Sequence, residues 1–330
     1  PMADVTDAAF RQIIAKYGKP DLMFTEFVSA DGLCHPVGRE RLLIDLQYSE
    51  SERPIVAQLF TAQPEKLEQA AKLCAELGFD GVDINMGCPD RTIEKQGAGA
   101  ALMKNPQLAR ELIQAAKRGL MSRSHLDMPV SVKTRLGYNR DELETWLPEL
   151  LAEEPAAVTI HARTRKEMSK VPARWERIKR AVEIRDNLKS QTLIIGNGDA
   201  LDLADAKQKA ETTGADGIML GRAIFGNPWL FASGQASVVY SRSARGIRDQ
   251  QNLTPTLPER LHVMLEHTKL FEELLGAHKS FAIMKKHYKA YVTDKALREQ
   301  LMSCANAHEV ETTVGSTGSR PRTQRCPFRT

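Results

Sequence analysis

The sequence lacks a long apolar run and lacks paired cysteines. None of its apolar stretches approaches the roughly 20 residues that a membrane-spanning helix needs, and no signal-peptide pattern opens it. Its cysteines, Cys34, Cys74, Cys88, Cys304 and Cys326, are odd in number, widely spaced and free of C-x-x-C pairs. This spacing indicates neither a disulfide framework nor a zinc site, so no metal is expected. We expect a cytoplasmic protein with no membrane association.

The chain also lacks a general excess of positive charge. Its net charge of +4, with an isoelectric point near 8.8, matches the surplus in the last sixteen residues. These hold Arg320, Arg322, Arg325 and Arg329 and no acid, and elsewhere 42 basic residues face 42 acidic ones. Global basicity therefore says little about partners, and a nucleic-acid surface would have to be a local patch.

Short apolar runs alternate with amphipathic segments along much of the chain. The amphipathic segments, such as 63–78 and 105–119, carry apolar residues at three- and four-residue spacing, and Gly78 and Gly119 are expected to end them. Strand–helix alternation of this kind is typical of parallel strands joined by crossover helices. The strand candidates are residues 21–28, 54–60, 79–87, 129–135, 156–162, 192–198 and 215–222.

Polar or reactive residues lie at the carboxyl ends of these candidates. They are Glu26, Gln58, Asn85 with Cys88, Lys133 with Arg135, His161 with Arg163, Asn197 with Asp199, and Gly221 with Arg222. A doubly wound sheet concentrates its site at one switch point, whereas a barrel draws it from many strand tips. We therefore predict an α/β protein of the (β/α)8 TIM-barrel class. Its first strand would be truncated here, with Pro1 to Ala3 as the strand tip and Thr6 or Asp7 near the N-cap of the following helix.

The pattern changes after the last strand candidate. Residues 1–232 form the predicted barrel domain, and the Ser-, Gly-, Arg- and Gln-rich stretch 233–257 is predicted to be a linker. Helical periodicity over residues 258–305 predicts a small all-helical domain. Residues 306–330 are polar and aperiodic, which predicts a disordered tail.

Individual strand-end residues allow two interpretations. Lys133, in an apolar run, is either a snorkelling or salt-bridged lysine or a cation placed against a cofactor ring or a substrate oxygen. Gln58 and His161 pose the same question, and each alone is more often a satisfied polar residue than a ligand. Gly198 and Gly221, near Arg222, fit either tight turns or the phosphate site that barrels build after their last two strands.

Cys88 follows a strand candidate within "GFDGVDINMGCPD", residues 78 to 90. A free cysteine is most often a small buried hydrophobe, but this one stands at a strand tip that faces the predicted barrel mouth. With an ordinary pKa of about 8.5 its thiol would be mostly protonated near neutrality. Cys88 is therefore a candidate proton donor and also a possible nucleophile.

Ten segments in a fixed order resemble one enzyme family. They are "PMADVTDAAFR", "TEFVSADGL", "QLF", "GFDGVDINMGCPD", "GAGAALMKNP", "VSVKTRLG", "TIHARTR", "IIGNGD", "GIMLGRAIFGNPWLF" and "MKKHYKAY". Together they resemble the tRNA-dihydrouridine synthases, densely over residues 1–231 and more loosely to about residue 292. The resemblance implies an FMN-binding barrel with a helical tRNA-binding domain. It also implies reduction of the C5–C6 double bond of particular tRNA uridines at the expense of NADPH.

The resemblance also implies residue roles. Cys88 would be the general acid that gives a proton to C5, while hydride passes from flavin N5 to C6. The uracil would be oriented by Asn85 and Arg163, and Lys285 and Lys286 would bind the tRNA backbone. The flavin would be contacted by Pro1, Met2 and Ala3 at its ring, by Gln58, Lys133 and His161 at its polar edge, and by Asn197, Gly198, Asp199, Gly221 and Arg222 at its phosphate. We expect a monomer whose partner is tRNA.

Two other functions fit parts of this pattern. Dihydroorotate dehydrogenases are FMN barrels that act on the same bond of a free pyrimidine, but they would not need the helical domain and its basic residues. A tRNA-binding protein without catalysis is the other alternative. The presence of Cys88, Lys133 and both glycine tips argues against it.

Overall fold

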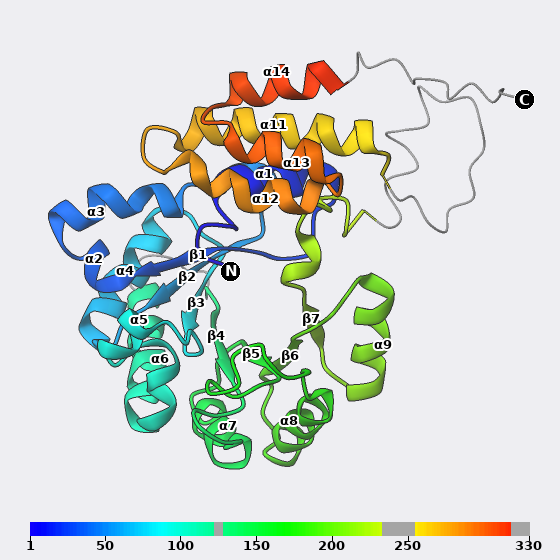
Figure 1. Cartoon of the computed structure of the whole chain (residues 1–330). Coiled ribbons are helices and arrows are strands. Elements are labelled where there is room, and N and C mark those ends of the chain that lie inside the picture. Colours follow the sequence, from blue (N-terminus) through cyan, green and yellow to red (C-terminus); the bar gives the residue numbers. More distant parts are fainter. Residues whose placement is uncertain (122–127, 233–254, 318–330) are drawn as a thin grey trace, which may run out of the picture. The chain divides into compact units, whose positions relative to one another are not determined.

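A computed structural model describes residues 1–121, 128–232 and 255–317, and its sheet is parallel throughout (Figure 1). Seven strands lie side by side in chain order, from β1 at one edge to β7 at the other. They are β1 Met23–Ser29, β2 Ile55–Phe60, β3 Gly81–Asn85, β4 Val130–Arg135, β5 Ala157–His161, β6 Leu193–Asn197 and β7 Gly217–Met219. The predicted strands are confirmed, and the fold is TIM-barrel-like.

Helices connect the strands and lie along the outer side of the arc (Figure 1). The connecting α-helices are α2 Ala30–Leu33, α3 Pro36–Leu42, α4 Pro64–Glu76, α5 Arg91–Lys95, α6 Pro106–Met121, α7 Leu143–Leu151, α8 Trp175–Asn187 and α9 Leu203–Thr213. Short 3-10 turns add η1 Leu43–Leu46, η2 Glu50–Glu52, η3 Gly99–Lys104 and η4 Arg222–Ile224. The apolar stripe of α4 shows why these helices dock, since Leu67, Ala70, Ala71 and Cys74 are all buried.

The two glycines expected to end helices behave differently. Gly78 follows α4 with a φ of +82°, as expected for a helix-terminating glycine. Gly119 lies inside α6, which continues to Met121, so that prediction is wrong. A Cβ on Gly119 would collide with the backbone of Glu68 in α4, and glycine there lets the two helices approach closely.

The amino-terminal helix α1 spans Ala8–Tyr17, and Asp7 is its N-cap. The Asp7 carboxylate accepts a hydrogen bond of 2.9 Å from the backbone N–H of Phe10, which satisfies one of the free donors at the helix start. This agrees with the predicted cap.

The strand register brings polar residues of neighbouring strands to the same level. Gln58 pairs with Asp83, Asp83 with Ser131, and Asn85 with Lys133. The alternate positions Val82, Ile84 and Val132 are fully buried in the core. Because side chains alternate between the faces of a strand, one face carries the core and the other carries the polar residues.

The carboxyl-terminal part is helical. It contains α11 Leu257–Leu275, η5 Phe281–Ile283, α12 Met284–Tyr291, α13 Lys295–Ser303 and α14 Ala307–Thr317. The chain divides into two compact units, the first including Pro1–Ile224 and the second these helices together with Phe225–Asn227. The predicted linker lies largely outside the described residues.

One expectation for the carboxyl-terminal part needs correction. Disorder from residue 306 is wrong for 307–317, because Ala307 and Val310 are buried at helical spacing in α14, which packs on α11. Residues 318–330 lie outside the described part. In α12, the residues His287, Tyr288 and Tyr291 are buried and form its inner face. They cannot join the adjacent lysines on an RNA-binding surface.

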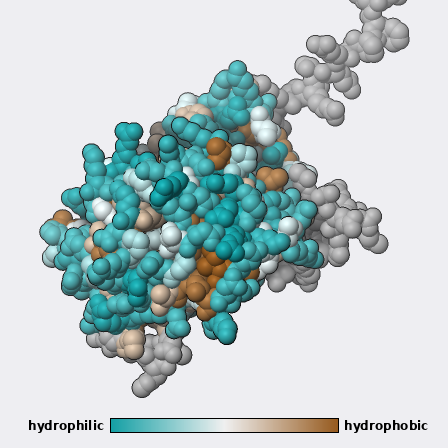
Figure 2. Space-filling view, turned by 90° about the horizontal axis from the view of Figure 1, so that it is seen from below, coloured by the Kyte–Doolittle hydropathy of each residue, from teal (hydrophilic) through white to brown (hydrophobic). Residues whose placement is uncertain are grey.

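In the part of the chain that the structure describes, no helix has both the length and the apolar character required to cross a membrane. The face shown in Figure 2 is mostly hydrophilic, with a small hydrophobic patch.

Candidate active site

The carboxyl ends of β2 to β6 bring most of the predicted site residues together. Gln58, Asn85, Lys133, His161 and Asn197 lie at or near the ends of five successive strands. Hydrogen bonds join Asn85 to Gln58 and Lys133 to Asn197, so these side chains share one face of the sheet. Side chains from the tips of several successive strands therefore lie on one face of the sheet.

Cys88 lies on a short loop that follows β3 and is held at its backbone. The side-chain oxygen of Asn85 accepts hydrogen bonds from the N–H groups of Gly87, at 3.2 Å, and Cys88, at 2.9 Å. The Cys88 carbonyl accepts from the N–H of Ala100 at 2.9 Å. Gly99 has a φ of +59°, and any Cβ there would press on the Cys88 carbonyl, so a glycine is needed for this approach.

The thiol of Cys88 is half-buried, and burial raises its pKa above the ordinary value. It therefore remains protonated near neutral pH and can donate a proton. Cys74, by contrast, is fully buried in α4, where burial raises its pKa to about 12. That residue is part of the core.

Lys133 lies on β4 with its ammonium group among the strand tips. Its Nζ donates to the side-chain oxygen of Asn197 at 3.3 Å, and Asn197 in turn donates to the carbonyl of Met219 at 2.8 Å. Burial, and next the charge of Arg135, lower the Lys133 pKa to about 8. The ammonium keeps hydrogen-bonding capacity beyond this one contact, which is what an anion-binding group requires.

His161, at the end of β5, is neutral. Burial and then the positive charges of Lys133 and Arg135 lower its pKa to about 2. Its Nε2 lies 3.0 Å from Nη1 of Arg163. Because a guanidinium can only donate, Nε2 accepts and the ring proton belongs on Nδ1. Nδ1–H then remains as a donor for a ligand atom.

Arg163 and Arg222 converge on Asp199. Arg163 is 3% exposed and forms a salt bridge with Asp199, and it also donates to the carbonyl of Val171 at 2.6 Å. Arg222 is 66% exposed and donates to the other oxygen of Asp199 at 2.8 Å. Burial opposes ionisation of Asp199, but the N–H of Ala173 and Arg163 together lower its pKa. Asp199 is therefore a counter-ion that holds the two arginines in place.

The two predicted glycines border this arginine pair. Gly198 has a φ of +127°, a conformation that side chains rarely adopt. Gly221 has nothing within 4 Å of where a Cβ would lie, so its backbone is approachable. Exposed backbone beside Arg222 fits a phosphate group.

The first residues lie beside the same cluster. The carbonyl of Met2 accepts from the N–H groups of Val5 at 3.2 Å and Thr6 at 3.0 Å, which forms a turn before α1. Burial, and next the charge of Lys133, lower the pKa of the Pro1 amino group to about 5. Pro1 and Met2 are half-buried, whereas Ala3 is exposed.

The predicted site omits two buried residues. Asp83 is fully buried on β3, and Arg135, at the end of β4, is 8% exposed. Arg135 donates to the carbonyls of Gly87, at 2.8 Å, and Met168, at 2.9 Å, and so links the Cys88 loop to the loop after β5. Burial lowers its pKa to about 10. The sequence feature that could have identified both residues is a charged side chain within an apolar strand candidate.

Lys285 and Lys286 belong to the second compact unit. Both lie on α12, where Lys285 is half-buried and Lys286 is exposed. Their expected contact with RNA remains a prediction.

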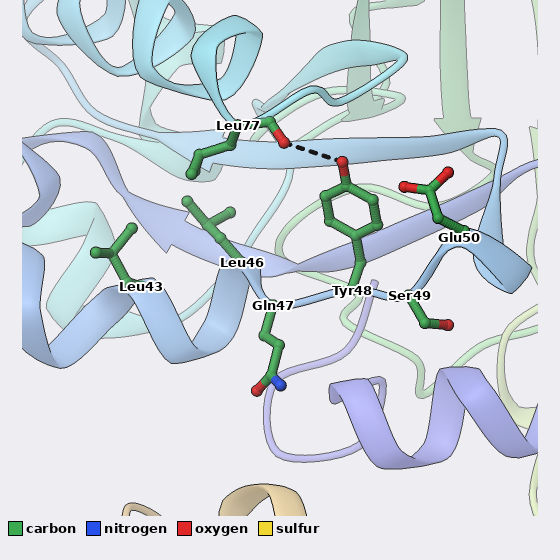
Figure 3. Close-up of a pocket in the computed structure, with 7 residues that line it drawn as sticks. All are labelled: Leu43, Leu46, Gln47, Tyr48, Ser49, Glu50 and Leu77. Atoms are coloured by element: carbon green, nitrogen blue, oxygen red, sulfur yellow. Dashed lines mark hydrogen bonds between the residues drawn. The ribbon is translucent and has the colours of Figure 1, made fainter.

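The described residues include no group of three or more His, Cys, Asp or Glu side chains that could hold a metal ion. A shallow hollow lies elsewhere, at the amino ends of the strands, and is lined by Leu43, Leu46, Gln47, Tyr48, Ser49, Glu50 and Leu77 (Figure 3). In Figure 3 the Tyr48 hydroxyl donates to the Leu77 carbonyl, at 2.9 Å. This hollow contains none of the strand-tip residues.

Comparisons with known proteins agree on one family. A family model described as "Dihydrouridine synthase (Dus)" matches residues 1–319. A relative from Bacillus subtilis (strain 168), "Probable tRNA-dihydrouridine synthase 2", is 46% identical over 232 residues, which is 70% of this chain and 69% of the relative. A "Probable tRNA-dihydrouridine synthase" from Staphylococcus aureus (strain MRSA252) is 37% identical over 315 residues, which is 94% of this chain and 89% of the relative.

A solved structure supports the fold alone. That of histamine dehydrogenase from Rhizobium sp. 4-9 matches with a TM-score of 0.52 and 13% identity, over 81% of this chain and 47% of the other.

Proposed function

This chain belongs to the dihydrouridine synthase family, and on that premise we propose that it reduces the C5–C6 double bond of specific uridines in tRNA. We propose FMN as its bound flavin and NADPH as the reductant. The observation that carries this proposal is the half-buried, protonated thiol of Cys88 at the tip of β3, beside a cluster of cationic and amide side chains.

The residues present fit a flavin with a phosphate group. Arg222 and the approachable backbone at Gly221 provide donors for the phosphate, and Gly198 lies on the neighbouring strand tip. Lys133 provides a positive charge for the electron-rich edge of the ring, supported by Gln58 and the Nδ1–H of His161. The other proposed contacts are Asn197 and Asp199 near the phosphate and Pro1, Met2 and Ala3 at the ring.

The bound flavin would supply the hydride that is added at uracil C6. The thiol of Cys88 would hold the proton that is delivered to C5, since burial keeps it protonated. The backbone of Cys88 is fixed by Asn85, which places the thiol at a defined point on the loop. Asn85 and Arg163 would orient the uracil. Each of the three guanidinium nitrogens of Arg163 already has a contact. To keep its salt bridge with Asp199, Arg163 would bind the uracil through N–H groups that these contacts do not use.

A uracil stacked within folded tRNA cannot present both faces to these strand tips. The base must therefore be extruded from its stack, which costs a few kcal/mol and is offset by stacking and edge contacts in the site. Lys285 and the exposed Lys286 on α12 would bind the tRNA backbone through its phosphates.

The test is an absorbance spectrum of the purified protein, recorded before and after anaerobic NADPH and then after unmodified tRNA. We expect flavin bands that NADPH bleaches and tRNA restores. A colourless protein that still binds tRNA would contradict the catalytic proposal. Flavin that is reoxidised by free pyrimidines but not by tRNA would contradict the proposal that tRNA is the substrate.

A further inference from the structure

Asp83 is a fully buried carboxyl group in the middle of β3, where the surrounding sequence is apolar. It lies directly between Gln58 on β2 and Ser131 on β4 in the strand register. Burial raises its pKa, and hydrogen bonds from Ser131 and Gln58 lower it. Burying a carboxyl group costs free energy unless hydrogen bonds compensate for it, so the hydrogen-bond partners of Asp83 indicate its role.

Both oxygens of Asp83 accept hydrogen bonds from side chains of the neighbouring strands. Oδ1 accepts from the hydroxyl of Ser131 at 2.5 Å, and Oδ2 accepts from Nε2 of Gln58 at 2.6 Å. A side-chain amide has one donating and one accepting end, and the two ends are nearly equal in shape. As a carboxylate, Asp83 can only accept, and it therefore decides which end of Gln58 faces it, namely the nitrogen.

The orientation of Gln58 then decides that of Asn85. With its nitrogen turned to Asp83, Gln58 presents Oε1 to Asn85, and it accepts from Nδ2 of Asn85 at 3.0 Å. Asn85 is left with its oxygen toward the Cys88 loop. That oxygen accepts the N–H groups of Gly87 and Cys88.

We propose that Asp83 is a positioning residue for Cys88, which it orients through the hydrogen-bond chain Asp83–Gln58–Asn85. This inference rests on the proposed function, in which the thiol of Cys88 delivers the proton. Asp83 touches neither the substrate nor the thiol, and it acts by selecting one of two amide orientations.

The alternative orientation carries two mismatches. A reversed Gln58 would place its oxygen against an oxygen of Asp83. A reversed Asn85 would place its NH2 group against the N–H groups of Gly87 and Cys88, and the loop would lose its anchor. All three polar side chains are at most 6% exposed, so water has little access to relieve such a mismatch.

The test compares three variants of the flavin-loaded protein. Asp83→Leu removes the acceptor. Asp83→Asn keeps one oxygen for Gln58, while its NH2 group can donate to the hydroxyl of Ser131. Ser131→Ala leaves the contact between Asp83 and Gln58 in place and is the matched control. Flavin reduction by NADPH and flavin reoxidation by unmodified tRNA are measured separately, in single turnovers.

We expect Asp83→Leu to slow reoxidation by tRNA by about 100-fold, with reduction by NADPH within about threefold of wild type, because only the tRNA half-reaction uses the thiol. Asp83→Asn and Ser131→Ala should remain within about threefold in both half-reactions. Wild-type reoxidation in Asp83→Leu would overturn the inference. An Asp83→Asn variant as slow as Asp83→Leu would also overturn it, since the negative charge and not the acceptor would then matter.

A fourth variant keeps the inference testable if Asp83→Leu fails to fold or to hold flavin. Gln58→Glu brings a second carboxyl group against Asp83, and the pair can keep its contact only by sharing one proton. Lys133 and the protonated nitrogen of Pro1 are nearby positive charges, and both favour loss of that proton. At pH values below the pKa of the Cys88 thiol, we expect reoxidation by tRNA to fall with rising pH in this variant but not in wild type. Parallel pH profiles would overturn the inference. If tRNA fails to reoxidise the wild-type flavin, the proposed function fails instead.

Discussion

The two ends of the parallel strands both hold buried or half-buried charged residues. The carboxyl ends also contain a salt bridge, between Arg163 and Asp199, but Lys133 and Arg135 there are satisfied differently from the amino-end residues. At the amino ends, Arg11 pairs with Glu52 just before β2, and Arg53 pairs with Asp80 just before β3. At the carboxyl ends, Lys133 and Arg135 make their hydrogen bonds to an amide oxygen and to backbone carbonyls. Within the described residues, no salt bridge joins either of them to a carboxylate.

The amino-end pair Arg11–Glu52 is a structural unit. The two side chains are 2% and 0% exposed and lie 2.6 Å apart, and Arg11 also donates to the carbonyls of Thr6 and Gln47. At the carboxyl ends, burial lowers the pKa of both Lys133 and Arg135, which means that their charge is held at a cost. Breaking a buried pair of charges destabilises the fold, whereas charge without an acidic partner is available for an anionic ligand.

The largest expected effect is a loss of activity, without loss of the fold, when Cys88 at the carboxyl ends is replaced. Cys88→Ala should lose about 10²- to 10⁴-fold in dihydrouridine formation, because the general acid is gone. It should keep its flavin and the oxidation of that flavin by quinones. The control is Cys34→Ala, another half-buried cysteine, which should retain full activity. Unchanged dihydrouridine yield in Cys88→Ala would remove Cys88 from its role.

The next effect concerns the amino-end pair. Glu52→Gln leaves the buried guanidinium of Arg11 without its counter-charge, and we expect a loss of about 3–5 kcal/mol in the free energy of unfolding. Denaturant titration measures this loss. Flavin reduction per folded molecule should remain at the wild-type rate. A variant that is stable but catalytically impaired would break the division between the two ends.

A smaller effect tests the cost of the charge on Lys133. Its pKa is lowered from 10.5 to about 8, so the folded protein bears the cost of a buried cation below about pH 8 and is relieved of it as pH rises toward 10.5. The unfolding free energy of flavin-free wild type should therefore rise over this range relative to that of Lys133→Met. We expect a difference on the order of 2 kcal/mol after discounting for residual solvent exposure. Identical pH profiles of the unfolding free energy for wild type and Lys133→Met would show that the charge of Lys133 does not destabilise the fold.

The smallest effect lies in the hollow of Figure 3. Tyr48→Phe removes a hydroxyl that shares its one proton between the carbonyls of Leu77, at 2.9 Å, and Gly78, at 3.0 Å, and that accepts from Arg53 at 2.7 Å. We expect a loss of about 1 kcal/mol in unfolding free energy and no change in either half-reaction. A slowed half-reaction would give this hollow a functional role that its position at the amino ends argues against.

The sequence predicts the strands well because parallel strands are buried on both faces and stand out as apolar runs. It also places Gln58, Asn85, Lys133, His161 and Asn197 at the strand ends, and the structure brings them together. It does not reveal that Asp83 belongs with them, and it places Arg135 at a strand end without indicating a role for it. Their significance depends on which strands become neighbours, and one chain's local pattern does not contain that information.

Other failures have the same origin. Gly119 does not end a helix. It lies within α6 and lets α4 approach closely, and this contact joins segments about fifty residues apart in the sequence. The segment 307–317 has few apolar residues, yet Val310 is fully buried because α11 offers a surface for it. In each case a tertiary neighbour overrides the local signal.

The raised pKa of Cys88 also affects the resistance of this protein to oxidants. Peroxides react with thiolates, and the fraction of thiolate falls about tenfold for each unit by which the pKa rises above the ambient pH. The burial that retains the proton therefore also slows conversion of the sulfur to sulfenic acid. We therefore expect Cys88 to be a poor target for oxidative inactivation, and alkylating agents that depend on the thiolate should modify it slowly.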